Sequence, residues 1–572
     1  MDETLIDTLD AATSVTYKGY TFLDNNLDPT HWSFAEITAE ARRVGACLHS
    51  LGLARGDRLA LVLNSPEDFV LSFLGCVSAG IMPVPMYPPL ALGRMDNYIE
   101  RALGILRVSG AVALLTSRDL IPVLNLVSSR TPGVERIMDV EMLRQAVTDH
   151  PEPECVTMPD DPCFLQFTSG STSAPRGVVV THRNLIANSR AIIEALEIDP
   201  DRDRAASWLP LYHDMGLIGF VIATLVGQVP VVIIPTIAFV KHPGVWMETV
   251  HKYRATITFG PNFAFDLASK RIPRNSRFID LSCLRVLGCG AEPINPRTME
   301  RFLATFAQWG LKSNSIMPCY GMAEATLAIA FDHLHRPVRK LVIDRQAYES
   351  ENVAKPLHPG DSYDPKKRFE LVSCGRTFKD HEVRIVNEDG EALPEGRVGE
   401  IVFRGPSVTP GYFQNPEASE ELLKGGWLHT GDLGFILDGD LYISGRQKDL
   451  VIINGRNYPP QAIEWVVEEI PGIRKGSVVA FSVCGDSTEK LIIIAETLMP
   501  ENGELASNIR EQVRSAFGLS VSEVVLVRRG SIPKTSSGKL QRRRAKALFE
   551  GGMLRNTDSP SEAIPADNSV LV

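Results

Sequence analysis

Short apolar runs alternate with longer helical patterns through the first two thirds of the chain. Strand-like runs are expected at 59–63, 111–115, 178–180, 231–234, 256–259 and 284–287. Helical patterns separate them, at 34–51, 66–79, 96–109, 182–196 and 296–309. Continuous apolar strands are typical of parallel sheets that helices cover on both faces. The pattern therefore predicts an α/β fold with parallel sheets.

The pattern changes near residue 380, where short strands replace the earlier alternation. Strands are expected at 382–386 and 400–403, with Asn-Glu-Asp-Gly and Pro-Glu-Gly turns between them, which indicates a small β unit. From residue 446 to about 550, short strands and helices mix again over a length typical of a compact α+β domain. We therefore predict a large N-terminal domain of several subdomains (1–445), a small hinged C-terminal domain (446–551) and a disordered polar tail (552–572).

Composition narrows the classes of partner. Hydrophobic residues make up 44% and charged residues 22% of the 572 residues, as in ordinary globular proteins. The formal net charge of -10 argues against a nucleic-acid partner and against docking of a basic surface to a membrane. The chain has 9 Cys, an odd number, and no CxxC pair, which indicates core thiols in a reducing, cytoplasmic environment.

Residues 221–240 carry no charge and approach the length of a membrane span. Gly227, Gln228, Pro230 and Pro235 interrupt this stretch. It is therefore expected to form a buried helix, a turn and a strand at 229–234, and no membrane span is predicted. The acidic N-terminus MDETLIDTLD lacks the basic start and the apolar run of a signal peptide.

A loop rich in small hydroxyl residues follows an apolar strand near residue 168. Small residues let backbone N–H groups approach an anion closely, hydroxyls add donors, and an arginine adds a fixed positive charge. A flexible linker is the alternative, but strand-like segments flank the loop on both sides. The Walker pattern GxxxxGK[ST] is absent. We predict a phosphate-binding loop formed by Thr168, Ser169, Gly170, Ser171, Thr172, Ser173 and Arg176.

This loop resembles the phosphate loop of the adenylate-forming superfamily, which includes acyl-CoA synthetases, adenylation domains of peptide synthetases and luciferases. The superfamily usually has Lys where this chain has Arg176, so the positive charge is kept. Further segments resemble the superfamily's motifs in the same order, from WLPLYHDMGL at 208–217 to PKTSSGKLQRR at 533–543. The resemblance covers about residues 15–550 and implies ATP and Mg²⁺ as cofactors.

The residues that resemble the superfamily's nucleotide site lie at strand ends and turns. Small residues after a strand leave room for a flat ring, and Tyr320 offers an aromatic face for stacking on adenine. The carboxylate of Asp432 can accept both ribose hydroxyls. Together with the phosphate loop, the resemblance assigns nucleotide binding to Gly290, Ala291, Glu292, Cys319, Tyr320, Gly321, Met322, Asp432 and Arg446.

Three residues are expected to act in catalysis. Glu324 offers a carboxylate oxygen, the ligand type that Mg²⁺ prefers, and is the predicted metal ligand. His213 is similar to the superfamily's substrate-facing histidine, although a His-Asp pair alone is more often structural. Lys539 is expected on a mobile loop, where its ammonium bridges the attacking carboxylate and the α-phosphate. By resemblance, Lys448 and Asp449 mark the hinge between the two domains.

Within the superfamily, the chain is most similar to fatty acyl-AMP ligases. The segments AGIMPVPMYPP at 79–89, LPLYHDMGLIG at 209–219 and VSCGRT at 372–377 carry this similarity. The path from Glu324 to Gly375 is also long, and the resemblance implies an inserted motif that keeps the domains out of the arrangement that uses CoA. Such an insert is expected within about 331–370, and a tolerated surface insertion is the alternative.

The resulting interpretation is a fatty acyl-AMP ligase. Such an enzyme joins a fatty acid to the AMP part of ATP and passes the acyl group to the phosphopantetheine of a separate acyl carrier protein. Carrier proteins are acidic, so a local basic patch at Arg542, Arg543, Arg544 or Lys546 is expected to meet one. Two alternatives stay open: an acyl-CoA synthetase of the same fold, and a non-catalytic protein that binds acyl-adenylate or nucleotide.

Overall fold

The fold is known from a computed structural model. It describes residues 3–89, 95–131, 133–146, 156–168, 175–272, 279–358, 364, 367–453, 456–484, 489–497, 503–535 and 538–554. Most of the tail predicted at 552–572 lies outside these ranges. No helix among the described residues is long and apolar enough to cross a membrane.

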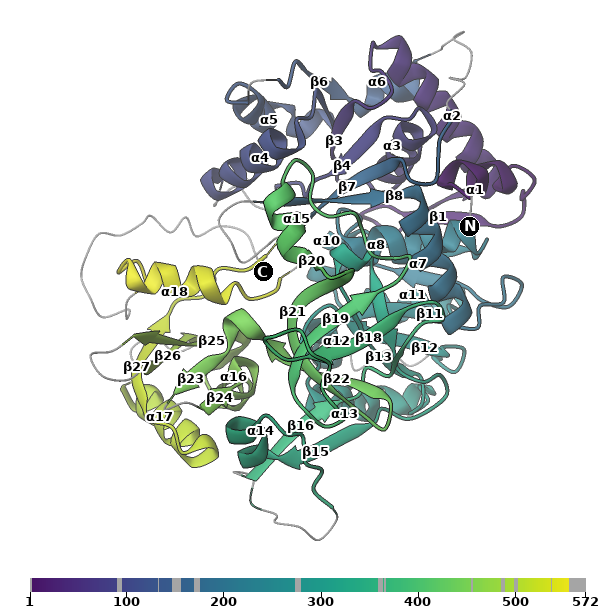
Figure 1. Ribbon diagram of the computed structural model, residues 1–572. Coiled ribbons are helices and arrows are strands. Elements are labelled where there is room, and N and C mark those ends of the chain that lie inside the picture. The colour runs from purple at the N-terminus through teal and green to yellow at the C-terminus, as the bar shows by residue number, and fades with distance from the viewer. Residues whose placement is uncertain are drawn as a thin grey trace.

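The largest sheet of the described structure has nine strands, and its middle is parallel (Figure 1). Antiparallel pairings occur toward its two edges, where β2, β14 and β17 are added. In spatial order the strands are β17 (Arg376–Thr377), β14 (Ala328–Phe331), β13 (Ile316–Gly321), β12 (Val286–Gly290), β11 (Ile257–Pro261), β9 (Ala205–Ser207), β10 (Val231–Ile233), β1 (Gly19–Leu23) and β2 (Pro29–Ser33).

A second, fully parallel sheet is built from the N-terminal part of the chain, at the top of Figure 1. Its strands are β4 (Met82–Pro85), β3 (Arg58–Val62), β5 (Ala113–Thr116) and β6 (Arg136–Asp139). The predicted α/β class is thus confirmed, and the apolar runs of the sequence, except 178–180, match strands of these two sheets with ends shifted by at most three residues.

Helices cover both sheets, and several begin with a side-chain cap. The Ser33 hydroxyl accepts a hydrogen bond from the Glu36 amide, and the Glu36 carboxylate accepts one from the Ser33 amide, which starts α2. The helices are α1 (Leu5–Ala12), α2 (Phe34–Ser50), α3 (Pro66–Ser78), α4 (Met95–Ser109), α5 (Ile121–Ser128), α6 (Val140–Gln145), α7 (His182–Ala195), α8 (Asp214–Leu217), α9 (Ala223–Val226), α10 (Thr236–Lys241), α11 (Val245–Tyr253), α12 (Asn262–Arg271) and α13 (Pro296–Phe306).

One strand prediction needs correction. The run at 178–180 does form a strand, β8 (Arg176–Thr181), but it does not belong to a parallel sheet. It pairs antiparallel with β7 (Pro162–Thr168) in a two-stranded sheet. The segment between the two strands is too short for the crossover helix that a parallel pair needs, so the chain turns back on itself.

The small β unit predicted near residue 380 forms a five-stranded sheet. Its elements are β18 (Glu382–Val386), β19 (Gly399–Arg404), α15 (Pro416–Leu422), β20 (Leu423–Lys424), β21 (Trp427–Leu437) and β22 (Asp440–Arg446). The segment expected to be inserted at 331–370 forms an antiparallel pair of strands with a helix between them: β15 (Lys340–Asp344), α14 (Arg345–Glu351) and β16 (Arg368–Val372).

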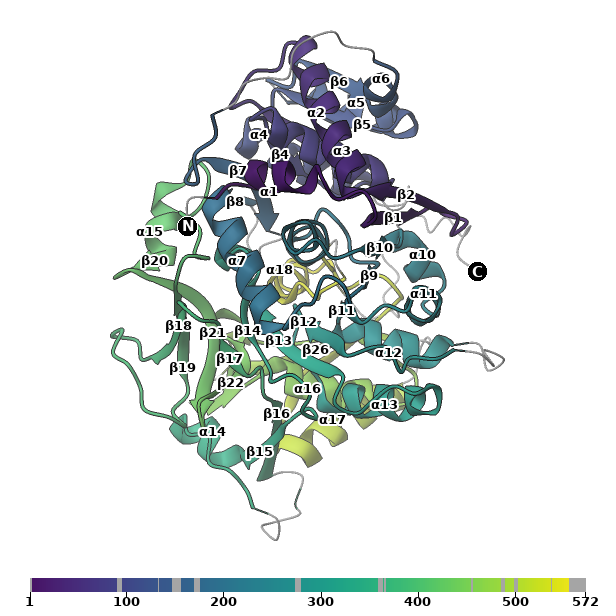
Figure 2. The same cartoon turned by 90° about the vertical axis from the view of Figure 1, so that its right-hand side faces the viewer.

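The C-terminal elements follow the 3-10 turn Gln447–Asp449 and build a separate α+β lobe, coloured green to yellow in Figures 1 and 2. Two of its apolar clusters contain only residues beyond 450. Its elements are β23 (Val451–Ile453), β24 (Arg456–Tyr458), α16 (Pro460–Glu468), β25 (Ile473–Cys484), β26 (Glu489–Thr497), α17 (Gly503–Phe517), β27 (Val521–Val527) and α18 (Arg542–Glu550).

Candidate active site

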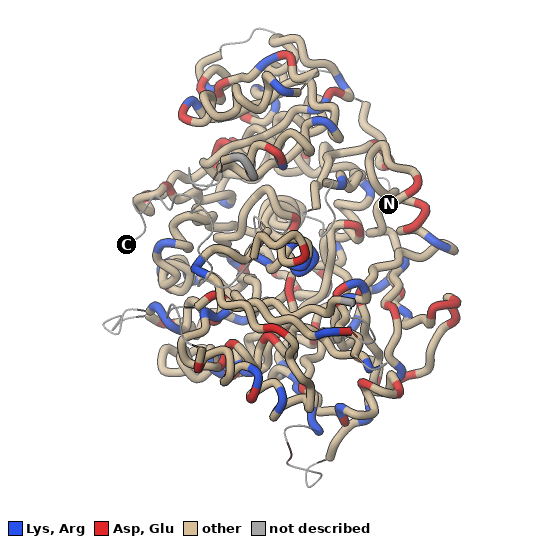
Figure 3. The backbone as a smooth tube through the Cα atoms, turned by 90° about the vertical axis from the view of Figure 1, so that its left-hand side faces the viewer, with Lys and Arg blue, Asp and Glu red and all other residues tan. Residues whose placement is uncertain are grey.

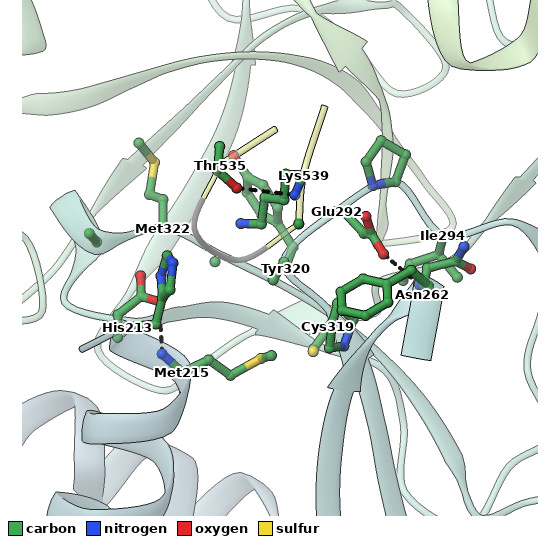
Figure 4. Close-up of a pocket in the computed structure, with 18 of the residues that line it drawn as sticks. His213, Met215, Asn262, Glu292, Ile294, Cys319, Tyr320, Met322, Thr535 and Lys539 are labelled. Atoms are coloured by element: carbon green, nitrogen blue, oxygen red, sulfur yellow. Dashed lines mark hydrogen bonds between the residues drawn. The ribbon is translucent and has the colours of Figure 1, made fainter. Parts of the chain in front are cut away.

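A cavity of about 2280 Å³ lies between the nine-stranded sheet, the small β unit and the C-terminal lobe. Ligand pockets usually measure about 300–1000 Å³, so this one has room for more than one small molecule. Segments from 166 to 543 line it. Figure 4 shows that Tyr320, Glu292 and Lys539, from three distant segments, come together there.

The predicted phosphate loop starts and ends at this cavity. Thr168, the last residue of β7, and Arg176, the first of β8, are paired across the two strands, and both line the cavity. The loop residues between them, Ser169, Gly170, Ser171, Thr172 and Ser173, lie outside the described part of the chain.

The predicted adenine residues lie at the carboxyl ends of two neighbouring parallel strands. β12 ends at Gly290 and β13 at Gly321, and the two strands pair side by side. The residues that end or follow these two strands line the cavity. This is the expected place, because α/β sheets bind ligands at the carboxyl ends of their parallel strands. A side chain at Gly290 would meet the Cys319 sulfur at 2.5 Å, so glycine is needed for this close packing. The residues in question are Ala291, Glu292, Cys319, Tyr320, Gly321 and Met322.

Asp432 joins the nucleotide residues of three segments. One carboxylate oxygen accepts a hydrogen bond from the Tyr320 hydroxyl and the other from Arg446 Nε, both at 2.7 Å. Asp432 raises the pKa of Arg446, which stays charged. Each carboxylate oxygen can accept a second bond, so the side chain still has capacity for ribose hydroxyls.

A residue that sequence reasoning missed, Tyr412, connects two of the predicted residues. Its hydroxyl donates to Glu324 Oε1 at 2.8 Å, and the Arg176 guanidinium lies 5.1 Å from its ring centroid. A bridge between Val178 and Tyr412 holds the tyrosine beside β8. Its position in a Pro-Gly-Tyr turn was the signal that could have singled it out.

His213 lines the cavity and directly precedes α8. Burial lowers its pKa to about 4, so the imidazole is neutral near pH 7. Its Nε2 atom is buried, and it has no hydrogen-bond partner among the residues the structure describes. A buried polar atom of this kind usually meets a ligand or water.

Lys539 enters the cavity from the C-terminal lobe. Burial lowers its pKa, while the nearby carboxylates of Asp214 and Glu292 act in the opposite direction. Within the described ranges no carboxylate lies close enough to form an ion pair with its ammonium. Glu292 itself accepts a hydrogen bond from the Phe263 amide at 2.6 Å, at the start of α12.

The remaining part of the cavity is apolar. It lies between α7, a π-helical turn at Ile218–Ile222 and the strands of the large sheet. π-helical turns often occur at functional sites because they redirect side chains. The lining residues here include Ile192, Ile193, Leu196, Ile198, Gly219, Phe220, Ala223, Val229, Phe259 and Leu327.

Comparisons with known proteins agree with this geometry. The family described as "AMP-binding enzyme" matches residues 11–413 of the chain. The chain belongs to this family. It is an AMP-forming ligase with the fold of adenylate-forming enzymes, in which ATP is the source of the AMP group.

Three proteins show what this AMP-forming ligase is similar to within the family. A solved structure of a fatty acyl-adenylate ligase, from work on Escherichia coli and Legionella pneumophila enzymes, is 34% identical with a TM-score of 0.89 and covers 96% of this chain and 98% of that chain. The medium-chain-fatty-acid–[acyl-carrier-protein] ligase JamA of Moorena producens is 34% identical, covering 94% of this chain and 93% of JamA. A Caulobacter vibrioides protein named as an acyl-CoA synthetase is 36% identical over 91% and 90% of the two chains.

Glu324 of this ligase fits a divalent cation. It is buried, and burial raises its pKa although the Tyr412 hydroxyl works against this. No Lys, Arg or His in the described ranges forms an ion pair with it. A carboxylate oxygen without an ion-pair partner is the ligand type that Mg²⁺ prefers.

The basic patch predicted for a carrier protein needs correction in this ligase. Arg542 is not available to a partner, because its side chain is 16% exposed and is paired with Glu464 and Asp449. Arg543 lines the cavity, and Arg544 and Lys546 are partly exposed. Basic and acidic residues are interspersed along the backbone (Figure 3). Consecutive residues of a helix point to different sides of it, so these neighbouring arginines have different surroundings.

Proposed function

We propose that this AMP-forming ligase activates a fatty acid with ATP and passes the acyl group to the phosphopantetheine thiol of a separate acyl carrier protein. The observation that carries the proposal is one cavity with two kinds of lining. Side chains of α7 and the π-helical turn form its apolar branch, and Arg176, Asp432 and Lys539 belong to its charged section. Burial of an alkyl chain is favourable by about 0.8 kcal/mol per CH₂. A long acyl chain therefore gains binding energy in the apolar branch, while its carboxylate faces the charged section.

The first step joins the carboxylate to the nucleotide. A carboxylate oxygen attacks the α-phosphorus, the bond from that phosphorus to the bridging oxygen breaks, and pyrophosphate leaves with the electron pair. Two anions must approach each other, and the ammonium of Lys539 offsets their repulsion. Holding the reactants in line contributes on the order of 7–11 kcal/mol.

The other predicted residues bind and orient the nucleotide. Arg176 and the phosphate loop hold the β- and γ-phosphates, Tyr320 faces the adenine, and Asp432 accepts from the ribose. Glu324 is the residue that would hold Mg²⁺, which when bound supplies positive charge next to the phosphates. The neutral His213 orients the acyl carboxylate without adding charge.

In the second step the thiol sulfur of the carrier's phosphopantetheine attacks the acyl carbonyl carbon. The bond from that carbon to the AMP oxygen breaks, AMP leaves, and the thiol proton is lost to solvent. Residues 1–445 and 446–551 act as two domains with a hinge at Lys448 and Asp449. The separate apolar clusters beyond residue 450 support this division.

Contacts of the inserted segment favour a carrier protein over CoA. Arg345 Nη1 donates to the Ala516 carbonyl at 2.6 Å, and its guanidinium lies 4.4 Å from the Phe517 ring centroid. Asn457 Nδ2 donates to Asn352 Oδ1 at 3.2 Å. These contacts hold the C-terminal lobe in the arrangement that places Lys539 in the cavity, and they must break before the lobe can rotate.

The second candidate is an acyl-CoA synthetase, which the Caulobacter relative's name favours. The test is pyrophosphate exchange with purified protein and a series of fatty acids from octanoate to stearate, followed by transfer to CoA or to holo carrier protein in parallel. Fatty-acid-dependent exchange with transfer to the carrier alone supports the proposal. Robust acyl-CoA formation selects the second candidate, and absence of exchange with any acid indicates a non-catalytic binding protein.

A further inference from the structure

Lys539 lies in a small hairpin whose shape is held by its own backbone. The Thr535 amide donates to the Lys539 carbonyl at 2.8 Å, and the Gln541 amide donates to the Pro533 carbonyl at 3.0 Å. The Lys539 amide donates to the Thr535 hydroxyl at 3.1 Å. These bonds set the shape of the hairpin but do not determine where it lies in the cavity. Its position depends on what holds its base.

Arg542, directly after the hairpin, is anchored to the body of the C-terminal lobe. Its Nε and Nη2 atoms donate to the two carboxylate oxygens of Glu464, each at 2.7 Å. The Glu464 side chain is only 3% exposed, and it also accepts from the Ala480 amide at 3.1 Å. A buried two-pronged ion pair of this kind has a fixed geometry, and loss of one partner leaves an uncompensated charge.

The same guanidinium also reaches the predicted hinge. Arg542 Nη1 lies 3.5 Å from Asp449 Oδ2, and the Asp449 side chain is 13% exposed. Asp449 ends the 3-10 turn that connects the last strand of the small β unit to the C-terminal lobe. A change in backbone conformation at this turn therefore alters the Arg542 contact.

A second anchor comes from the N-terminal part of the chain. Arg101 Nη2, on α4, donates to Gln541 Oε1 at 2.7 Å. Gln541 is 9% exposed, so this bond crosses between the two lobes in a mostly dry setting. The base of the hairpin is thus held on one side by α16 and the hinge turn, and on the other by α4.

We propose that Arg542 is a positioning residue for Lys539, and that its ion pairs with Glu464 and Asp449 couple the hinge to the place of the Lys539 ammonium. The inference rests on the proposed adenylation function of this cavity. Arg542 lines the cavity, but all three nitrogens of its guanidinium are bound to Glu464 and Asp449. It acts by keeping the hairpin at the place where the Lys539 ammonium can reach the α-phosphate. A shift of that ammonium by about 1 Å lowers the rate of adenylate formation on the order of 100-fold.

The experiment compares Arg542→Met and Arg542→Lys with Lys546→Ala, which removes a positive charge from the same helix at a residue that forms no ion pair with Glu464 or Asp449. In Arg542→Met we expect kcat of adenylate formation to fall about 10- to 100-fold, with KM for ATP and fatty acid within about threefold. Transfer from preformed acyl-adenylate to a thiol acceptor stays within about twofold of wild type. Arg542→Lys recovers part of the rate, because one contact to Glu464 can reform.

Hydrogen exchange by mass spectrometry gives a readout that is independent of activity. In Arg542→Met, amides of residues 534, 535 and 538–541 are expected to exchange several-fold faster while those of β25 and β26 keep wild-type rates. Unchanged exchange in the hairpin, or equal loss in both half-reactions with faster exchange throughout the lobe, overturns the positioning role. If wild-type protein forms no acyl-adenylate, the proposed function fails, and the exchange data still decide whether Arg542 holds the hairpin.

Discussion

Two cavity side chains, Lys539 and His213, mark the positions on which the proposed chemistry depends. Lys539 contributes an ammonium whose pKa burial lowers, and it stands among carboxylates without an ion pair within the described ranges. His213 contributes a buried nitrogen that no described atom satisfies. Such groups are unfavourable in an empty site and become favourable when a charged or polar ligand fills it.

Replacement of Lys539 by Ala is expected to reduce adenylate formation about 100- to 1000-fold, because the positive charge beside the α-phosphate is lost. ATP binding, measured by calorimetry, should weaken by less than about fivefold, since the proposal assigns the phosphates to Arg176 and the ribose to Asp432. Lys546→Ala serves as the control for loss of charge. Near-normal pyrophosphate exchange in Lys539→Ala would remove the lysine from the mechanism.

The buried imidazole of His213 predicts a particular pH dependence. Burial depresses the pKa to about 4, so the neutral form persists when pH falls through 6.5 and is lost only as pH approaches 4. The ratio of kcat/KM for fatty acid between wild type and His213→Gln should therefore stay constant from about pH 5.5 to 8. A step in this ratio near pH 6.5 would show that the imidazole titrates as an exposed histidine does.

The sequence predicted the positions of some site residues but not of others. Tyr320, Asp432 and Lys539 stand in motifs that resemble known sites, and the fold brings all three to one cavity. Tyr412 was missed because its Pro-Gly-Tyr turn marks a bend but does not show that the hydroxyl reaches Glu324 and the ring lies beside Arg176. Arg542 was expected at the surface, since a run of three arginines does not reveal which one meets buried carboxylates.

At the scale of elements, the π-helical turn at Ile218–Ile222 turns Gly219 toward the apolar branch. A Cβ atom placed on Gly219 would lie 3.5 Å from Leu327 Cδ2, so a methyl group fits but a larger side chain presses on Leu327. Gly219→Val is expected to narrow the branch and to shift acyl preference toward shorter chains, with about a tenfold loss for palmitate relative to octanoate.

A second substitution makes the Gly219 prediction specific. Leu327→Ala in the same chain as Gly219→Val restores space and should recover most of the activity with palmitate. Val226→Leu, in the neighbouring α9 but outside the cavity lining, is the control. The measurement is pyrophosphate exchange with fatty acids of different chain length. An unchanged chain-length profile in Gly219→Val means that the acyl chain does not lie beside Gly219.

Most elements followed from local pattern, and the exceptions have a physical cause. Helix α2 was expected at 34–51 and occupies Phe34–Ser50, because its capping box and apolar face lie within the same stretch. The strand at 178–180 was assigned to a parallel sheet because parallel and buried antiparallel strands are equally apolar. The direction of pairing depends on the connection, and apolar composition carries no information about it.

At the scale of the whole molecule, Arg345 of the segment 331–370 contacts the C-terminal lobe, and the proposed function requires these contacts to restrain it. Arg345→Ala removes the hydrogen bond to Ala516 and the contact with Phe517, so the lobe should rotate more readily. We expect acyl-CoA formation to rise at least about fivefold over wild type, while adenylate formation stays within about threefold. The measurement is thioester formation with CoA and labelled fatty acid.

Lys340→Ala is the matched control for the Arg345 experiment. Lys340 lies in the same inserted segment, but its ion pairs are with Glu300 and Glu370, which do not belong to the C-terminal lobe. The control should leave acceptor preference unchanged. If Arg345→Ala forms no more acyl-CoA than wild type, the insert does not restrain the lobe through this contact.

Local order along the chain was enough to establish the α/β class, the small β unit, the nucleotide motifs and the family. These properties depend on hydrophobic periodicity and on short motifs, which a linear sequence records directly. Other properties depend on contacts between residues far apart in the chain. These are the set of side chains that share the cavity, the choice of the buried arginine and the place where the segment 331–370 contacts the C-terminal lobe. Such contacts arise from packing of complete elements, so they became visible only once the elements were assembled.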